Sequence, residues 1–223
     1  KEIISSKAAA EAIAQFPPTV MAEIMKGASG LGDLGAFLVQ CFSKYSYENI
    51  TPTLPTRTFE GRLDLKVGDP TIQLIEVGPC HTRGDVIVHV PDAGVVFAAD
   101  ILFIGGHQIM WAGPHDNFIR AIDLIIDLKP KYIVPGHGPV ATAKDAMNVK
   151  DYWLYLAAEA RKRYDAGQPA FEASKDIPLG PYASWSDPER MILNVNALYK
   201  EFSGDPEPLN PVEQLGQMAK WRL

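Results

Sequence analysis

The chain has 223 residues, of which 47% are hydrophobic and 22% are charged, so disorder of the whole chain is excluded. Its 21 basic and 27 acidic residues give a net charge of −6, without the basic surplus typical of nucleic-acid-binding proteins. No apolar run approaches the roughly 18 residues that cross a membrane. Two cysteines are too few for a disulfide framework or a cysteine-only metal site. We therefore expect the protein to bind neither nucleic acid nor a membrane.

The first residue is Lys1 rather than Met, and an apolar pair follows directly at Ile3 and Ile4. No signal peptide is visible, so the sequence is compatible with a cytoplasmic location and with secretion followed by processing. The length fits one generous domain, and we expect residues 1–223 to form it.

The first quarter of the chain predicts mainly short helices. Ser5 or Ser6 can cap the first helix, because a serine oxygen accepts a hydrogen bond from a free backbone N–H. Prolines and glycines separate the helices that follow. The predicted elements are a strand at 2–6, helices at 8–15, 21–26 and 34–45, and a proline-threonine loop at 49–56.

The pattern changes to strands after residue 56. Gly61 lies between two short β-rich runs, 57–60 and 63–67, which predicts a hairpin. The other predicted elements are strands at 71–77, 85–90, 94–99 and 132–134, helices at 116–128, 145–166 and 187–202, and a surface loop at 203–211. This order favours one α/β domain with its core at about 57–146 and a helical extension at about 147–223.

Two of the five histidines lie in glycine-rich segments at the ends of predicted strands. His81 lies within Gly-Pro-Cys-His-Thr-Arg-Gly-Asp, residues 78–85, and His137 lies within Pro-Gly-His-Gly-Pro, residues 135–139. Glycine neighbours remove side-chain bulk and let a ligand come close to the backbone. Ligands usually bind at strand ends in α/β sheets, so both histidines are candidate site residues.

Asp100 is the third candidate, because an apolar strand delivers its carboxylate. A buried charge without a partner is costly, so this carboxylate needs a cation or strong donors nearby. Two imidazoles and one carboxylate suit zinc, iron or manganese. The pattern alone leaves the metal site and purely structural roles about equally favoured, since single histidines and aspartates at strand ends are often structural.

Three elements in the segment from about 71 to 146 resemble the metallo-β-lactamase fold superfamily. They are His-Thr-x-Gly-Asp at 81–85, an aspartate after an apolar strand at Asp100, and Pro-Gly-His-Gly at 135–138. All three occur in the order found in that superfamily. The resemblance covers about a third of the chain strongly, and the first 70 residues only loosely.

The resemblance implies an αββα sandwich with a metal site at one edge of two sheets. By matching position, His81 would bind a first metal ion, His137 a second, and Asp100 would bridge both. Asp85 would brace the loop around His81 from outside the ligand set. With an aspartate rather than a cysteine at position 100, the chain is more similar to the thioesterase and lactonase members than to the cysteine-bearing β-lactamases.

The sequence departs from the superfamily in one respect. The signature His-x-His-x-Asp-His, which supplies most of the remaining ligands there, is absent, and no histidine precedes His81. We expect the sequence to begin just after that signature. A site with so few ligands would bind zinc weakly or not at all.

The sequence gives weaker predictions for four other residues. His107 follows two glycines and is a candidate for the pocket mouth, and Trp111 is a candidate substrate contact. His89 is expected to be structural in mid-strand, and His115 to lie in the turn before a helix. The aromatic stripe at 152–156 suits the core or a homodimer interface.

Three functions remain in competition at this point. The first is a hydrolase with two zinc ions, whose metal-activated hydroxide attacks an ester, thioester, lactone or amide carbonyl of a small molecule. The second is an iron-dependent oxidoreductase of the same superfamily. The third is an inactive, metal-free fragment, which the missing signature favours for the chain as it stands. We prefer the hydrolase.

Overall fold

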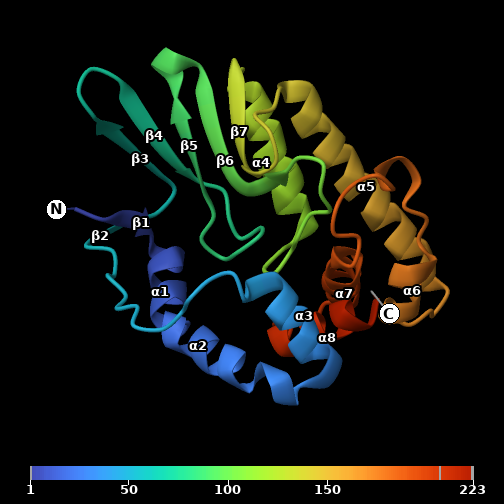
Figure 1. Cartoon of the computed structure of the whole chain (residues 1–223). Coiled ribbons are helices and arrows are strands. Elements are labelled where there is room, and N and C mark those ends of the chain that lie inside the picture. Colours follow the sequence, from blue (N-terminus) through green and yellow to red (C-terminus); the bar gives the residue numbers. More distant parts are fainter. Residues whose placement is uncertain (1, 206, 222–223) are drawn as a thin grey trace.

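The centre of the molecule is a five-stranded sheet in the order β3-β4-β5-β6-β7 (Figure 1). The computed structural model describes residues 2–205 and 207–221. Neighbouring strands are antiparallel except β6 and β7, which run parallel. The strands are β3 (Arg62–Lys66), β4 (Thr71–Glu76), β5 (Val86–Val90), β6 (Val95–Phe103) and β7 (Tyr132–His137).

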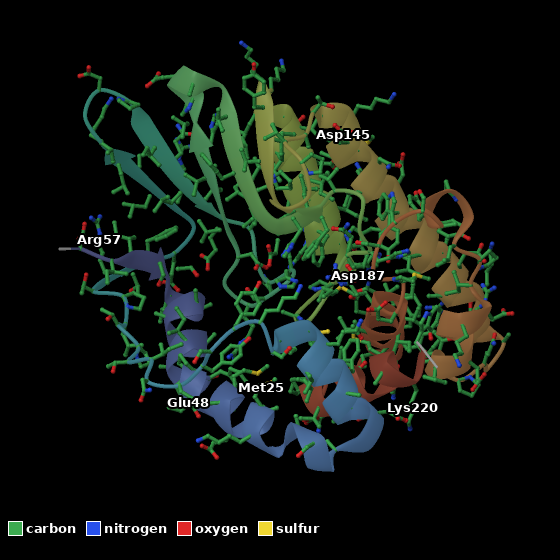
Figure 2. The ribbon with its side chains drawn as sticks, viewed as in Figure 1. Met25, Glu48, Arg57, Asp145, Asp187 and Lys220 are labelled. Carbon is green, nitrogen blue, oxygen red and sulfur yellow. The ribbon has the colours of Figure 1, made fainter. Side chains whose placement is uncertain are left out.

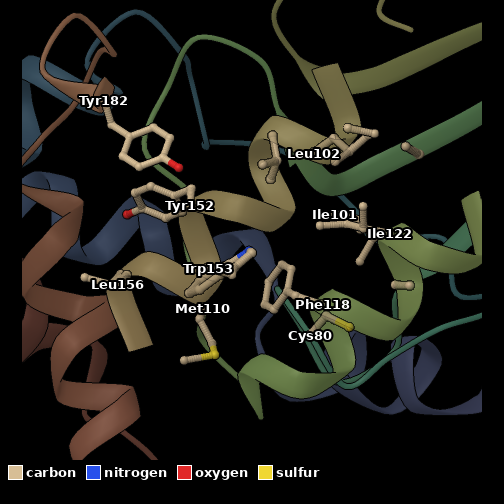
Figure 3. Close-up of a cluster of buried hydrophobic side chains, with 14 of the residues drawn as sticks. Cys80, Ile101, Leu102, Met110, Phe118, Ile122, Tyr152, Trp153, Leu156 and Tyr182 are labelled. Carbon is tan, nitrogen blue, oxygen red and sulfur yellow. The ribbon is translucent and has the colours of Figure 1, made fainter. Parts of the chain in front are cut away.

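Helices cover one face of this sheet and form the main core with it (Figure 3). Helix α4 (His115–Asp127) connects β6 to β7, and α5 (Ala143–Asp165) packs against it. At the start of α5, the Asp145 carboxylate accepts a hydrogen bond from the Thr142 N–H (Figure 2). The strands contribute buried side chains such as Ile87, and the helices contribute Phe118 and Trp153. Apolar burial on this side therefore holds β6 and β7 against the helices.

The opposite face of the sheet is also apolar, although Phe97 remains 45% exposed and Tyr132 47% exposed. Strand β5 reads Val-Ile-Val-His-Val and β6 begins Val-Val-Phe-Ala-Ala, so neither shows the polar alternation of a solvated face. Register pairing aligns one apolar side chain from each strand in a row across this face. The row is Leu63, Leu74, Val88, Phe97 and Val134.

A second cluster joins the beginning of the chain to its end. Helix α3 packs against α8, and their contact includes the buried Phe37 and Met218. The remaining helices are α1 (Lys7–Gln15), α2 (Pro18–Gly27), α3 (Gly32–Phe42), α6 (Ala170–Asp176), α7 (Arg190–Ser203) and α8 (Pro211–Trp221), with short 3-10 turns at Ala28–Gly30, Pro91–Ala93 and Gly180–Tyr182. No helix of the described residues is both long and apolar enough to cross a membrane.

The predicted hairpin around Gly61 is wrong. Strand β2 (Arg57–Phe59) pairs in parallel with β1 (Ile4–Ser6), and β3 pairs with β4 instead. Gly61 is held by Glu76, which accepts from the Gly61 N–H through its carboxylate (2.8 Å) and donates its own N–H to the Gly61 carbonyl (2.7 Å). The glycine therefore redirects the chain from one sheet to the other.

Helices α6 and α8 do not follow from the sequence pattern. Helix α6 has only seven residues, and α8 follows the proline-rich segment that predicts a surface loop at 203–211. Most of that segment lies between α7 and α8, and residue 206 within it is outside the described residues.

Replacing Ser6 by alanine is expected to destabilise the fold by about 1–2 kcal/mol, because two hydrogen bonds are lost. The buried Ser6 Oγ accepts from the Ala9 N–H (3.2 Å) at the start of α1 and donates to the Gly84 carbonyl (2.8 Å). Urea unfolding measures the change. Ser5→Ala is the matched control, because the Ser5 hydroxyl bonds only the carbonyl of its neighbour. Equal effects of the two substitutions would contradict the prediction.

The contact between His115 and Glu201 is expected to stabilise the fold at acidic pH and to weaken as pH rises. Burial lowers the pKa of His115, but hydrogen bonding and attraction to Glu201 outweigh it, so the net shift of this pKa is upward. The folded chain therefore binds this proton more tightly than the unfolded chain, whose pKa is about 6.5. The contribution is complete below that pH and is lost as pH rises through the folded pKa.

Urea unfolding of the wild type and of Glu201→Gln over this pH range tests the prediction. The difference in unfolding free energy between the two proteins should shrink as pH rises. A difference that stays constant or grows with pH would show that the contact does not depend on the charge of His115.

Candidate metal centre

Three segments bring His81, Asp100 and His137 together at one edge of the sheet. His81 lies in the loop between β4 and β5, Asp100 lies in β6, and His137 ends β7. The His81 Nε2 lies 3.3 Å from Asp100 Oδ2, and the His137 Nε2 lies 3.6 Å from Asp100 Oδ1. A single carboxylate therefore stands between two imidazoles, with one oxygen toward each.

Local backbone irregularities aim the Asp100 carboxylate. The sequence predicts that Asp100 follows its strand, but the residue lies within β6. The pairing of β6 with β7 shifts register on both sides of Ala99. Ala99 has a φ of +47°, a left-handed conformation that is uncommon outside glycine. Such bulges redirect side chains near functional sites.

Gly136 makes room for Asp100 rather than for an external ligand. A Cβ atom at position 136 would lie 2.0 Å from Asp100 Oδ1, closer than any side chain can approach. A Cβ atom on Gly138, which has a φ of +98°, would lie 2.4 Å from the Ile104 carbonyl oxygen. The glycines around His137 are thus required by the packing of the site itself.

A hydrogen bond to a backbone carbonyl fixes the orientation of the His81 ring. Its Nδ1 lies 2.9 Å from the Ile109 carbonyl oxygen, which can only accept, so Nδ1 carries the proton. In the neutral form of the ring, the Nε2 lone pair would then face Asp100 Oδ2. Two acceptors at this distance require a cation or a second proton between them. This arrangement matches metal-binding histidines, whose other ring nitrogen donates to a carbonyl or carboxylate.

His137 presents its ring at the rim of the site. The ring stacks on Phe103 with centroids 4.3 Å apart and planes within 5°, while the side chain remains 58% exposed. The Arg190 guanidinium also lies over the Phe103 ring, 5.1 Å from its centroid, and pairs with Asp187 at 3.2 Å (Figure 2). Phe103 therefore supports a histidine that reaches toward solvent.

Asp85 stabilises the loop that carries His81. Its carboxylate accepts hydrogen bonds from the backbone N–H groups of Cys80 and Thr82, and from the Thr82 hydroxyl at 2.6 Å. Burial raises the pKa of Asp85, and the Thr82 and Cys80 hydrogen bonds offset part of that rise. These contacts fit the bracing role that the resemblance implies for Asp85.

Cys80 and His107 are both buried groups rather than exposed donors. Burial raises the pKa of the Cys80 thiol to about 12, and its sulfur donates to the Val77 carbonyl. The expectation that His107 lines the pocket mouth is wrong, because the side chain is 0% exposed and contacts Tyr152 and Trp185. Burial lowers the pKa of His107 to about 4, so the ring is neutral inside the core.

Trp111 contacts the loop that carries His81 through its backbone. Its backbone N–H donates to the His81 carbonyl (3.1 Å), and its partly exposed ring packs against the second apolar cluster. Its role in substrate binding stays a prediction. Sequence reasoning missed the Ile109 carbonyl and Phe103, because a backbone oxygen and an apolar strand residue give no motif.

The donor set suits zinc in kind but is incomplete in number. Among residues 2–205 and 207–221, no three His, Cys, Asp or Glu side chains converge on a single metal position. Asp100 pairs with one histidine on each side, so each metal ion would receive two protein donors. Zinc sites generally have three or four protein ligands. The described residues alone therefore do not complete a zinc site of the usual kind.

The sequence model of the metallo-beta-lactamase superfamily matches residues 8–137. No curated protein sequence gives a significant match. A solved metallo-beta-lactamase family protein from Thermus thermophilus is 14% identical with a TM-score of 0.57, over 95% of this chain and 70% of the other. These findings confirm the family resemblance and the α/β fold class expected from it.

Two further solved structures are those of a stereoselective inverting sec-alkylsulfatase, Pisa1, from Pseudomonas sp. The first is 13% identical with a TM-score of 0.53, over 71% of this chain and 29% of the enzyme. A double mutant of PisA1 is 12% identical with a TM-score of 0.62, over 95% of this chain and 39% of the enzyme. The chain thus spans well under half of the alkylsulfatase, and identities this low show the fold alone.

Gly136→Ala is expected to displace the Asp100 carboxylate and to weaken Zn²⁺ binding by about 10-fold or more, since even partners outside the ligand set affect affinity that much. A Zn²⁺ titration followed by the ring NMR signals of His81 and His137 measures the change. Gly27→Ala is the matched control, because a Cβ there meets nothing within 4 Å. Unchanged zinc binding in Gly136→Ala would show that the carboxylate position does not matter.

Proposed function

Because the chain belongs to the metallo-beta-lactamase superfamily, which includes hydrolases such as alkylsulfatases and β-lactamases, we propose that it forms part of a metal-dependent hydrolase. Its substrate would be a small molecule with an ester, thioester, lactone or amide carbonyl. One observation carries the proposal: the two oxygens of Asp100 face the Nε2 atoms of His81 and His137 at 3.3 and 3.6 Å.

In this function the three side chains hold and space the metal ions. His81 and His137 would each bind one ion, and Asp100 would lie between the two. A bound zinc pair supplies an activated water at neutral pH and polarises the carbonyl that is attacked. The chain itself keeps His81 in one tautomer through Ile109, fixes the His81 loop through Asp85, and leaves His137 open to solvent. No nucleophilic side chain is required.

The proposal requires metal donors beyond the described residues. One histidine and Asp100 together supply two donors to each ion, which is fewer than zinc sites normally use. A partner segment or chain that contributes imidazole or carboxylate groups would complete the set. Without it, we expect zinc to bind weakly.

The first test is the metal content of the purified protein, measured by elemental mass spectrometry, together with hydrolysis assays on ester, thioester, lactone and β-lactam substrates. About two zinc ions per chain and hydrolysis that a chelator abolishes would support the proposal. Stoichiometric iron would contradict it in favour of redox chemistry. Absence of metal even after zinc is added would show that this chain alone is not the functional unit.

His137→Ala is expected to lower metal-dependent turnover by more than ~100-fold, because even residues outside the ligand set change activity by about 10–100-fold. Turnover is measured at saturating zinc in the protein with its complete donor set. His89→Gln is the control, because His89 lies in the middle of β5 and bonds Gln73 of the neighbouring strand β4. Full activity of His137→Ala would overturn the assignment of this ligand.

A further inference from the structure

Asn194, a fully buried polar residue of α7, connects the C-terminal helices to the candidate site. Its Oδ1 accepts from the Met110 N–H (3.0 Å), and its Nδ2 donates to the Gln108 carbonyl (2.8 Å) and the Tyr152 hydroxyl oxygen (3.2 Å). The carboxamide therefore holds the backbone of the loop after β6 on both sides of Ile109.

The Met110 N–H and the Ile109 carbonyl belong to the same peptide unit, which is planar. Because the unit is trans, its N–H and C=O groups point in opposite directions. Asn194 binds the N–H, and the C=O accepts from the His81 Nδ1–H at 2.9 Å. An unbroken chain of hydrogen bonds thus runs from α7 through one peptide plane to the His81 ring.

The rest of the loop is held independently of this peptide unit. The Gln108 side chain accepts from the Phe103 N–H (3.1 Å) and donates to the Phe103 and Gly106 carbonyls. The His107 carbonyl accepts from Arg190. Removing Asn194 would therefore free the Gln108 carbonyl and the peptide unit 109–110, while the Gln108 side chain and Arg190 keep the base of the loop in place.

The surroundings of Asn194 make a purely space-filling role a poor explanation. Asn194 is fully buried in α7, between Leu193 of the second apolar cluster and Val195 of the main core. Burying an amide among such residues is unfavourable unless its hydrogen bonds are made. All three of its polar contacts end on the loop backbone or on Tyr152.

We propose that Asn194 is a positioning residue for His81. By fixing the peptide unit 109–110, it holds the Ile109 carbonyl where it accepts from the His81 Nδ1–H and turns Nε2 of the ring toward Asp100. The inference concerns the ring of His81 itself, and it rests on the proposed function only for its consequence on metal affinity.

The test is whether Nδ1 of His81 carries a proton in the metal-free protein, read from the ¹⁵N chemical shifts of labelled histidine. The wild type should show Nδ1–H, alone or together with the Nε2–H that the Asp100 carboxylate favours. Asn194→Leu should shift the ratio of rings protonated at Nδ1 to rings in the Nε2–H tautomer by at least about fivefold toward the Nε2–H tautomer, as expected for the loss of one hydrogen bond. A wild-type ring in the Nε2–H tautomer would overturn the proposal without any variant.

Asn196→Leu is the matched control, two residues away on the same helix. Asn196 donates instead to Gln214 and Gln217 of α8. It should destabilise the fold without changing the His81 tautomer. If both variants left the tautomer unchanged, or both changed it, Asn194 would have no specific role.

Zinc affinity, measured by competition with a chelating dye, separates this inference from the proposed function. Asn194→Leu should weaken zinc binding by about 10–100-fold, while Asn196→Leu should not. A tautomer shift in a protein that binds no zinc would uphold the positioning role and count against the hydrolase. Zinc-dependent hydrolysis by the wild type, together with an unchanged tautomer in Asn194→Leu, would support the hydrolase and overturn the positioning role.

Discussion

The Asp100 carboxylate between two imidazole nitrogens is the constraint on which the rest of the structure depends. With Nδ1 of His81 committed to the Ile109 carbonyl, its Nε2 and the carboxylate oxygen are acceptors that face one another at 3.3 Å. Such a contact is stable only with a positive species between the two groups. The bulge at Ala99, the absence of a side chain at Gly136 and the bracing by Asp85 all serve to maintain it.

The helices far along the chain are needed to hold this geometry. The loop after β6 is fixed by buried polar side chains: Gln108 bonds the end of β6, and Asn194 of α7 bonds the loop backbone. Buried amides that find every partner specify one arrangement of the backbone, whereas apolar packing alone specifies it less sharply. The C-terminal helices therefore act on His81 through hydrogen bonds in addition to covering the core.

The sequence predicts the site better than it predicts the connections. Strands β4 to β7 and helices α4, α5 and α7 follow from periodicity, and three short motifs single out His81, Asp100 and His137 before any geometry is known. The parallel pairing of β1 with β2 is not predictable locally, because it joins residues more than fifty positions apart. The prediction for His107 fails for a related reason: flanking glycines indicate a turn, but only tertiary packing decides that the ring faces inward.

The exposed apolar row and the candidate metal donors lie on the same strands. Phe97 belongs to the exposed apolar row and Asp100 to the donor set, three residues apart in β6, and Val134 and His137 have the same spacing in β7. Three residues of a strand span at most about 10 Å, and the bulge at Ala99 shortens this distance in β6. Strands that are apolar on both faces are typical of sheets covered on both sides. A polypeptide layer that covered Phe97 and Val134 would therefore bring its own side chains within reach of Asp100 and His137, so burial of the sheet and completion of the donor set are linked by the same short distance.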